Sequence, residues 1–260
     1  MNFLSFGQSV ILGIVEGLTE FLPISSTFHL IFSSQILGIT ETELLKVFQV
    51  FIQSGAILAV LWLFWKDIFH NRKMIEKLIL SFIPTAVVGF LLHSIIKNYF
   101  FETPLLMISA FIGVGILFIL FEKWHAKNTG DEKTLEEITW KDAVIIGLGQ
   151  ALAVLPGVSR AGAVILTMMV LKVRRDEAAK YSFLLALPTI LSAAALDVLS
   201  FENLGSITSS EISLFAVGFI TAFLSALVVL KWFIGYLQHH TLVTFGWYRI
   251  IAGTLLLLLL

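Results

Sequence analysis

The chain has 260 residues and a net charge of −1, and 58% of its residues are hydrophobic while only 13% are charged. Soluble proteins contain roughly 45–50% apolar and about 25% charged residues, so a soluble fold of this size could not bury so much apolar surface. The composition therefore excludes disordered, fibrous and nucleic-acid-binding proteins and predicts an integral membrane protein. Cysteine is absent, which excludes disulfides and thiolate metal sites.

Six apolar stretches approach the roughly 20 residues that a helix needs to cross a bilayer. They cover residues 48–65, 78–96, 105–121, 181–199, 212–232 and 245–260. Two further apolar regions, 3–37 and 144–171, are interrupted by polar residues and proline, so that each half is too short to span. We expect an all-α polytopic membrane protein that forms a single integral membrane domain over residues 1–260.

The lysine and arginine residues that connect these stretches are unevenly distributed. They gather in residues 66–77, 122–143 and 172–180. The remaining connections hold at most one each, in residues 38–47, 97–104 and 200–211. Because basic loops stay in the cytoplasm, the first group is predicted to lie inside, and residues 122–143 form a cytoplasmic linker. Residues 144–171 then enter and leave the membrane on one side, which predicts a re-entrant hairpin with residues 156–160 at its tip.

A weak internal repeat agrees with this topology. The sequence PISS at residues 23–26 precedes PGVS at residues 156–159 by 133 residues, and a one-residue gap aligns Glu16 with Gln150. We expect two inverted-topology repeats, about 1–125 and about 140–260, each with one re-entrant helical hairpin plus three transmembrane helices. Folds of this kind place a polar site where the broken helices meet.

The strongest candidates for chemistry lie in the first broken region, because ionisable residues inside apolar segments are costly. Glu16 and Glu20 are four residues apart and share one face of a helix. They are followed by the hydroxyl residues Ser25, Ser26 and Thr27 and by His29, a candidate nucleophile or proton carrier. The alternative for the two acids is a water-filled vestibule or the cap of an interfacial helix.

The second broken region carries a motif suited to an anion. A turn with Gly157 and Ser159 leads into a helix N-terminus, whose backbone N–H groups attract negative charge. Arg160 adds a planar set of donors that fits phosphate oxygens. The structural alternative for Arg160 is an ion pair with Glu16 or Glu20. Gln53, in the next apolar stretch after the first hairpin, either reaches the same site or packs against a hairpin.

These motifs resemble those of the BacA-type undecaprenyl-diphosphate phosphatases, which are linked to bacitracin resistance. The first motif stands as EGLTEFLPISSTFH at residues 16–29 and the second as PGVSRAG at residues 156–162. The similarity covers most of the chain and includes Tyr248-Arg249 near its end. Two positions depart from the family pattern: Phe28 replaces a usual glycine, and Ala161 replaces a usual serine. We expect Phe28 to tighten or re-aim the turn that carries the histidine.

The resemblance implies hydrolysis of undecaprenyl diphosphate to the monophosphate carrier lipid plus phosphate, for recycling of the lipid carrier in cell-wall biogenesis. It implies that Arg160 holds the diphosphate, that Ser26 or His29 attacks the terminal phosphorus or positions a water, and that Glu20 is the acid/base. Glu16 would orient Glu20 or help it to bind a divalent cation, Mg2+ or Ca2+. The other expected substrate-binding residues are Ser25, Thr27, Gln53, Gly157 and Ser159.

The alternative function is an inverted-repeat transporter or flippase for a prenyl-phosphate lipid, because broken helices are also typical of transporters. A lipid phosphatase of the acid-phosphatase type would need a lysine-arginine motif and two histidine motifs, which the sequence lacks. The expected partners are the prenyl diphosphate and membrane lipids, with no nucleic acid, and a homodimer is left open. The expected location is the plasma (inner) membrane, with the site facing outside.

Overall fold

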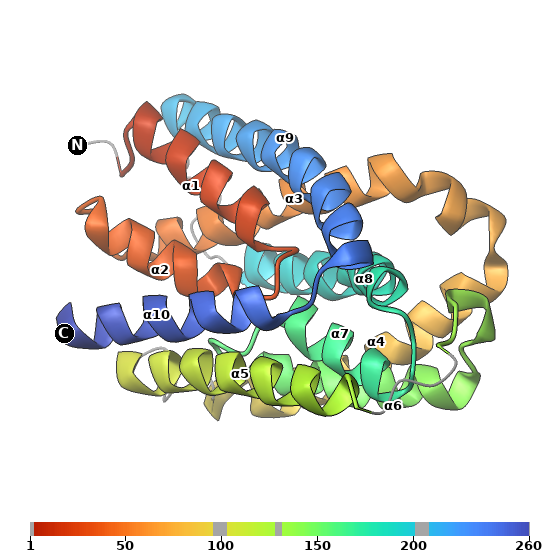
Figure 1. The fold of residues 1–260 in the computed structure, drawn as a ribbon. Helices are drawn as coiled ribbons and strands as arrows, with labels where there is room; N and C mark the ends of the chain where they lie inside the picture. The colour runs from red at the N-terminus through yellow and green to blue at the C-terminus, as the bar shows by residue number, and fades with distance from the viewer. Residues whose placement is uncertain (1–2, 96–102, 128–131, 201–207, 260) are drawn as a thin grey trace.

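The computed structural model describes residues 3–95, 103–127, 132–200 and 208–259. Within these ranges the regular structure is helical apart from one isolated β-bridge between Lys133 and Val173, as the all-α prediction requires (Figure 1). The helices before the linker are α1 (Phe6–Thr19), α2 (Ser26–Ile36), α3 (Glu43–His70), α4 (Arg72–Ile95) and α5 (Pro104–His125). Those after it are η2 (Leu135–Glu137), α6 (Trp140–Ala151), η3 (Leu152–Val154), α7 (Arg160–Val170), α8 (Arg175–Ser200), α9 (Ser209–His239) and α10 (Val243–Leu259).

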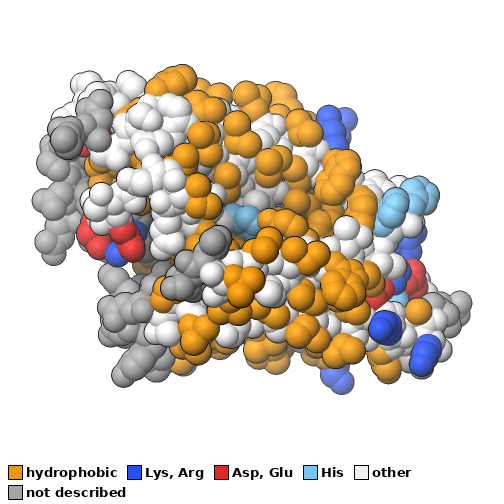
Figure 2. Space-filling view, turned by 60° about the vertical axis from the view of Figure 1, so that its left-hand side comes forward, with side chains coloured by type: hydrophobic (Ala, Val, Ile, Leu, Met, Phe, Trp, Pro, Cys, Tyr) orange, Lys and Arg blue, Asp and Glu red, His pale blue; other side chains and the backbone are white. Residues whose placement is uncertain are grey.

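Five of these helices, α3, α4, α5, α8 and α9, are long and apolar enough to cross a membrane. The sixth predicted span is α10, which is also apolar and has 17 residues. At 1.5 Å per residue it is about 26 Å long, close to the ~30 Å of a hydrocarbon core. Apolar side chains cover the middle of the molecule, and most of the visible Lys and Arg side chains lie at one end (Figure 2). The chain is a multi-pass membrane protein.

Both interrupted regions form helical hairpins of two short helices. In the first, α1 and α2 have 14 and 11 residues and are joined by a turn over residues 20–25. In the second, α6 and α7 have 12 and 11 residues and are joined by η3 and a turn over residues 155–159. Helices of 11 to 14 residues are about 16–21 Å long, so none of the four can cross a bilayer alone. In each hairpin the two short helices pack against each other.

The first helix of each hairpin, α1 or α6, begins with a capping box that the sequence encodes. Ser5 accepts a hydrogen bond from the backbone N–H of Gln8, whose side chain accepts one from the backbone of Ser5. Thr139 and Asp142 do the same at the start of α6. Such reciprocal bonds satisfy helix N–H groups that otherwise lack partners, so they fix where α1 and α6 start.

The second helix of each hairpin, α2 or α7, begins in a different and less common way. Ser25 and Ser159, directly before α2 and α7, have φ angles of 66° and 77°. Residues with a Cβ atom pay of order 1–3 kcal/mol for such backbone conformations. The two serines are 134 positions apart, so the backbone matches Ser26 with Arg160 as the first helical residue. The offset of 133 read from the sequence had matched Ser26 with Ser159.

Each hairpin packs against a long helix from the other half of the chain. Helix α1 lies along α9, as Figure 1 shows, and α6 lies along α4. In the first contact the Ser9 hydroxyl donates to the Leu214 carbonyl over 2.6 Å, and in the second the Ser81 hydroxyl donates to the Ala143 carbonyl over 2.7 Å. Helices α5 and α10 pack against each other, as do α3 and α8. The two hairpins are therefore held by reciprocal contacts.

The main hydrophobic cluster surrounds the turn of the first hairpin. Phe21 is fully buried and packs edge-on against Phe183 of α8, with ring centroids 5.3 Å apart and planes at 77°. Aromatic pairs favour this arrangement, which adds about 0.5–1.5 kcal/mol beyond area burial. Because Glu20 precedes Phe21 and Ser182 precedes Phe183, the contact brings the end of α1 beside the backbone of α8.

Candidate active site

The turns of the two hairpins meet around a cavity of about 160 Å³. All the predicted site residues except Glu16 and His29 line it: Glu20, Ser25, Ser26, Thr27, Gln53, Gly157, Ser159 and Arg160. The remaining lining residues are Pro156, which belongs to the predicted hairpin tip, and Ala153, Leu155 and Ile190, which were not predicted. The cavity therefore combines polar groups from both halves of the chain with an apolar wall from the second hairpin and α8.

One of the lining side chains, the carboxylate of Glu20, has two hydrogen-bond partners. The Ser26 hydroxyl donates a hydrogen bond to Glu20 Oε2, and Arg160 Nη2 donates one to Glu20 Oε1 over 3.2 Å. The Glu20 and Arg160 side chains are only 7% and 11% exposed. The ion pair that the sequence allowed as a structural alternative is thus present. The same carboxylate is placed to accept a proton from the serine hydroxyl.

Arg160 is held in place from a second side. Its Nη1 donates to the Ser182 carbonyl of α8 over 2.7 Å. Arginine carries five N–H donors in one plane, and its Nε has no partner among the described residues. The contacts with Glu20 and Ser182 fix the plane of the guanidinium while leaving donors available. The guanidinium can therefore bind a phosphate oxygen without breaking its hydrogen bonds to Glu20 and Ser182.

The turn before α7 is shaped by two residues of the motif. Ser159 Oγ accepts a hydrogen bond from the Gly162 backbone N–H over 3.2 Å, which caps the helix. Gly157 has a φ of 91°, and a Cβ atom there would collide with the carbonyl oxygen of Met107. Only glycine satisfies both conditions. Helices α2 and α7 therefore both start at the cavity, with the positive ends of their dipoles toward any bound anion.

Glu16 lies one helical turn before Glu20 but outside the cavity lining. It is fully buried, and both of its carboxylate oxygens lack a hydrogen-bond partner among the described residues. A buried carboxylate without a partner is costly, so this group is suited to receive a proton or a cation. Among the residues that the structure describes, no group of three or more His, Asp or Glu residues could hold a metal. A cation would therefore need substrate oxygens in addition to Glu16 and Glu20, which is how Mg2+ is commonly bound.

His29 turns away from the cavity and toward α10. Its Nδ1 lies 2.8 Å from the Ser25 carbonyl oxygen, and its Nε2 lies 2.6 Å from the Tyr248 hydroxyl. Its ring also stacks on the Tyr248 ring, with centroids 5.7 Å apart and planes at 11°. The structure therefore does not bring His29 to the group formed by Glu20, Ser26 and Arg160.

Arg249 of α10 is a residue of the site region to which the sequence analysis gave no role. It is fully buried and donates hydrogen bonds to three carbonyl oxygens: to Phe111 over 2.9 Å, to Pro23 over 3.0 Å and to Gly157. In the described part of the chain no carboxylate forms an ion pair with it. Arg249 thus ties the turns of both hairpins to α5. A charged residue inside the last apolar stretch was the signal that could have indicated its importance.

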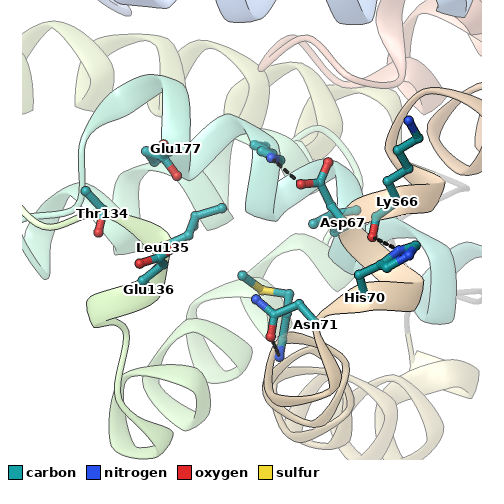
Figure 3. A pocket seen from close by; sticks show the side chains of 11 residues that line it. Lys66, Asp67, His70, Asn71, Thr134, Leu135, Glu136 and Glu177 are labelled. Carbon is teal, nitrogen blue, oxygen red and sulfur yellow. Dashed lines mark hydrogen bonds and ion pairs between the residues drawn. The ribbon is translucent and has the colours of Figure 1, made fainter.

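A larger hollow of about 630 Å³ lies at the connection between α3 and α4, against η2 and α8 (Figure 3). Two of its charged groups pair with each other, since Lys180 donates to Asp67 over 2.9 Å. It contains three acidic side chains and two lysines and none of the predicted site residues. A diphosphate would meet net negative charge there, so the smaller cavity is the candidate active site. The hollow is lined by Lys66, Asp67, His70, Asn71, Met74, Thr134, Leu135, Glu136, Glu177, Lys180 and Leu184.

The chain matches known proteins over nearly its whole length. The model of the family described as bacitracin resistance protein BacA matches residues 9–255. An undecaprenyl-diphosphatase from Campylobacter fetus subsp. fetus is 44% identical over 259 residues, which cover 98% of this chain and 99% of the relative. Undecaprenyl-diphosphatases from Aquifex aeolicus and Methanococcus aeolicus are 42% and 37% identical, over 95% and 96% of this chain and 95% and 97% of the relatives. With its two hairpin motifs inside the matched region, the chain belongs to the bacitracin resistance protein BacA family.

Proposed function

We propose that this protein hydrolyses undecaprenyl diphosphate to undecaprenyl monophosphate and phosphate, and so recycles the lipid carrier used in peptidoglycan synthesis. Relatives that match it from end to end carry the name undecaprenyl-diphosphatase. The structural observation that carries the proposal is the Glu20 carboxylate, which binds the Ser26 hydroxyl on one oxygen and the Arg160 guanidinium on the other. Neither the comparisons nor the described residues support the transporter alternative.

The geometry favours Ser26 over His29 as the nucleophile. Ser26 Oγ would form a bond to the terminal phosphorus while the bridging P–O bond breaks and releases prenyl monophosphate. Glu20 would accept the hydroxyl proton and pass it to the leaving phosphate. A water molecule would then attack the phosphoserine, give a proton to Glu20 and release inorganic phosphate, and the proton would return to Ser26. Glu20 is already hydrogen-bonded to Ser26, which is the arrangement that a general base needs.

Arg160 would supply the charge neutralisation on which phosphoryl transfer chiefly depends. Its remaining N–H donors, together with the N-termini of α2 and α7, would face the diphosphate oxygens. The lining groups of Ser25, Thr27, Gln53, Gly157 and Ser159 would complete the binding of the headgroup. The prenyl chain of the bound substrate would extend from the cavity along its apolar side, where Leu155 and Ile190 lie.

A divalent cation, Mg2+ or Ca2+, fits the acidic side of this site. Glu16 offers a buried carboxylate without a partner among the described residues, and Glu20 follows one turn later. These two residues would hold the cation together with the oxygens of the substrate. When bound, the cation would polarise the phosphoryl group and offset charge.

The fold that supports this site consists, in our proposal, of two inverted repeats over about 1–125 and 140–260. The reciprocal packing of α1 on α9 and of α6 on α4 supports this, as do the positive φ angles of Ser25 and Ser159. The hairpins would be re-entrant, the linker 122–143 would be cytoplasmic and the cavity would open to the outer side of the inner membrane. The oligomeric state, for which the sequence left a homodimer open, is tested by light scattering of the detergent-purified protein.

The direct test is phosphate release from undecaprenyl diphosphate by the detergent-purified protein. The wild type should turn over, and Ser26→Ala should reduce turnover to background because the attacking oxygen is gone. Ser213→Ala, at an exposed serine near the start of α9, is the matched control and should behave as the wild type. A wild type that releases no phosphate under conditions in which a relative is active would reject the proposed function.

A further inference from the structure

The hydrogen bonds of His29 define which ring nitrogen carries a proton. The Ser25 carbonyl oxygen can only accept, so Nδ1, at 2.8 Å, carries the proton. In the neutral imidazole, the form that could attack phosphorus, Nε2 is the nitrogen with the lone pair, and it lies 2.6 Å from the Tyr248 hydroxyl. The one nucleophilic nitrogen of neutral His29 is therefore already occupied by Tyr248.

Aromatic contacts hold the His29 ring in this orientation. Tyr248 stacks on one face, and the rings of Phe28 and Phe111 approach edge-on, with centroids 5.5 and 6.0 Å from that of His29 and planes at 67° to it. Phe28 and Phe111 are buried, so a rotation of the imidazole toward the cavity would have to displace packed side chains. The ring is fixed on the side of α10.

The group that His29 holds is adjacent to the proposed nucleophile. Both the backbone N–H of His29, over 3.3 Å, and its Nδ1 donate to the Ser25 carbonyl oxygen. That carbonyl belongs to the peptide group that joins Ser25 to Ser26. Ser25 has a φ of 66°, a conformation that persists only when its surroundings enforce it. The double hydrogen bond from His29 holds the carbonyl side of this residue, and with it the peptide group that leads into Ser26.

We propose that Tyr248 and His29 are positioning residues for Ser26. The Tyr248 hydroxyl holds the imidazole, the imidazole holds the Ser25 carbonyl, and this carbonyl sets the direction of the Ser26 side chain. The inference rests on the proposed function and replaces the alternative in which His29 itself attacks phosphorus. It assigns to α10 a direct part in the geometry of the reaction, although α10 does not line the cavity.

Substitutions at His29 separate positioning from attack. Asparagine keeps an amide donor close to the position of Nδ1 but has no nitrogen that can attack, so His29→Asn should stay within about 10-fold of wild-type kcat. Glutamine and alanine lose the donor to Ser25, and kcat should fall on the order of 100-fold, the cost of a small misplacement of reacting groups. KM should change little in all three, because the groups that bind the diphosphate are untouched.

Tyr248→Phe gives a second and independent measurement. It removes one hydrogen bond to His29, and kcat should fall about 3- to 10-fold at unchanged KM. Tyr236→Phe is the matched control, because Tyr236 also stacks on a histidine, His240, and hydrogen-bonds through its hydroxyl to Thr244 at the α9–α10 connection. Its kinetics should equal those of the wild type. Adding Tyr248→Phe to His29→Ala should cause no further loss, since the two side chains act in one chain of contacts.

The experiment is steady-state phosphate release from undecaprenyl diphosphate, with the melting temperature of each variant measured alongside. If His29 attacks phosphorus, His29→Asn is as inactive as His29→Ala, and Tyr248→Phe is as active as the wild type or faster because Nε2 is freed. Either result overturns the positioning role. If His29→Ala proves unfolded, the comparison of the asparagine and glutamine variants still decides. A wild type without activity is a different outcome, which rejects the proposed function and with it a role in that reaction.

Discussion

Phe28 stacks face to face on Phe111 of α5, with ring centroids 3.8 Å apart and ring planes within 1° of parallel. The Arg249 guanidinium lies 4.5 Å from the centre of the same Phe111 ring. The residue that departs from the usual glycine of the first motif is thus connected to the arginine that holds both hairpin turns. Phe28 adds a contact between the first turn of α2 and α5, which stabilises the turn that carries Ser26.

Phe28→Ala should lower the stability of the protein by about 3–5 kcal/mol, because it removes a fully packed ring and leaves a cavity. The melting temperature in detergent measures this loss, and turnover should fall with it since the start of α2 becomes less ordered. Phe90→Ala is the control, because Phe90 is 82% exposed on α4. Equal melting temperatures for the two variants would contradict the proposed role of the stack.

Arg249→Lys should reduce both stability and turnover even though it keeps the charge. A single ammonium group cannot reach three carbonyl oxygens on two turns and on α5 in the way that the planar guanidinium does. Each lost hydrogen bond to a charged group costs about 1.5–3 kcal/mol, which a thermal unfolding curve resolves readily. Arg72→Lys, at a side chain that is 92% exposed, should leave both quantities unchanged. An active Arg249→Lys protein of normal stability would show that the three bonds are dispensable.

Arg160→Lys should fold but lose roughly 30- to 1000-fold in turnover, which corresponds to ~2–4 kcal/mol of lost transition-state stabilisation. The ion pair with Glu20 gives Arg160 a structural part as well. Arg160→Ala should therefore be destabilised by about 3–5 kcal/mol, and the double variant Glu20→Gln/Arg160→Ala should recover much of this. Kinetics and melting temperature are measured together. An active Arg160→Lys enzyme would refute the role proposed for the guanidinium donors of this residue in binding the diphosphate.

Glu16→Gln should lower turnover severely without lowering stability. Because the Glu16 oxygens have no hydrogen-bond partner among the described residues, an amide of the same shape removes a buried charge and breaks no hydrogen bond with them. The melting temperature should therefore stay the same or rise. If the two acids hold a cation, a chelator should abolish wild-type turnover and Mg2+ or Ca2+ should restore it. Undiminished activity in the chelator, with metal content checked by elemental analysis, would reject the cation.

Single cysteines can test the topology because the chain contains none of its own. Arg72→Cys, between α3 and α4, Lys141→Cys, at the start of α6, and Arg174→Cys, directly before α8, should react with a membrane-impermeant thiol reagent only from the cytoplasmic side. Glu41→Cys, before α3, should react from outside. The Arg72 and Glu41 side chains are 92% and 75% exposed, so accessibility does not limit labelling. Labelling of the Lys141 and Arg174 positions, which lie before and after the second hairpin, from opposite sides would end the model of a re-entrant second hairpin.

The sequence by itself determined the membrane class, the spans and the two hairpins, because long apolar runs and their interruptions reflect a local requirement. A helix must be apolar over a bilayer's thickness, and a polar residue in such a run is costly wherever the rest of the chain lies. The same argument identified Glu20, Ser26 and Arg160 one residue at a time. Helix ends were less well predicted, since α3 runs over Glu43–His70 and extends beyond the apolar residues 48–65.

Only the tertiary structure decided which of these residues meet. Glu20 and Arg160 are 140 positions apart, and their contact depends on how α1, α7 and α8 cross. His29 lies three residues after Ser26, yet it faces α10, because its direction follows from the helical turn and from the Tyr248 ring that packs against it. Arg249 can hydrogen-bond to the turns of both hairpins only because α10 lies along α5. The sequence determines which reactive side chains the protein carries. Packing between distant segments determines where each of them points and which of them meet.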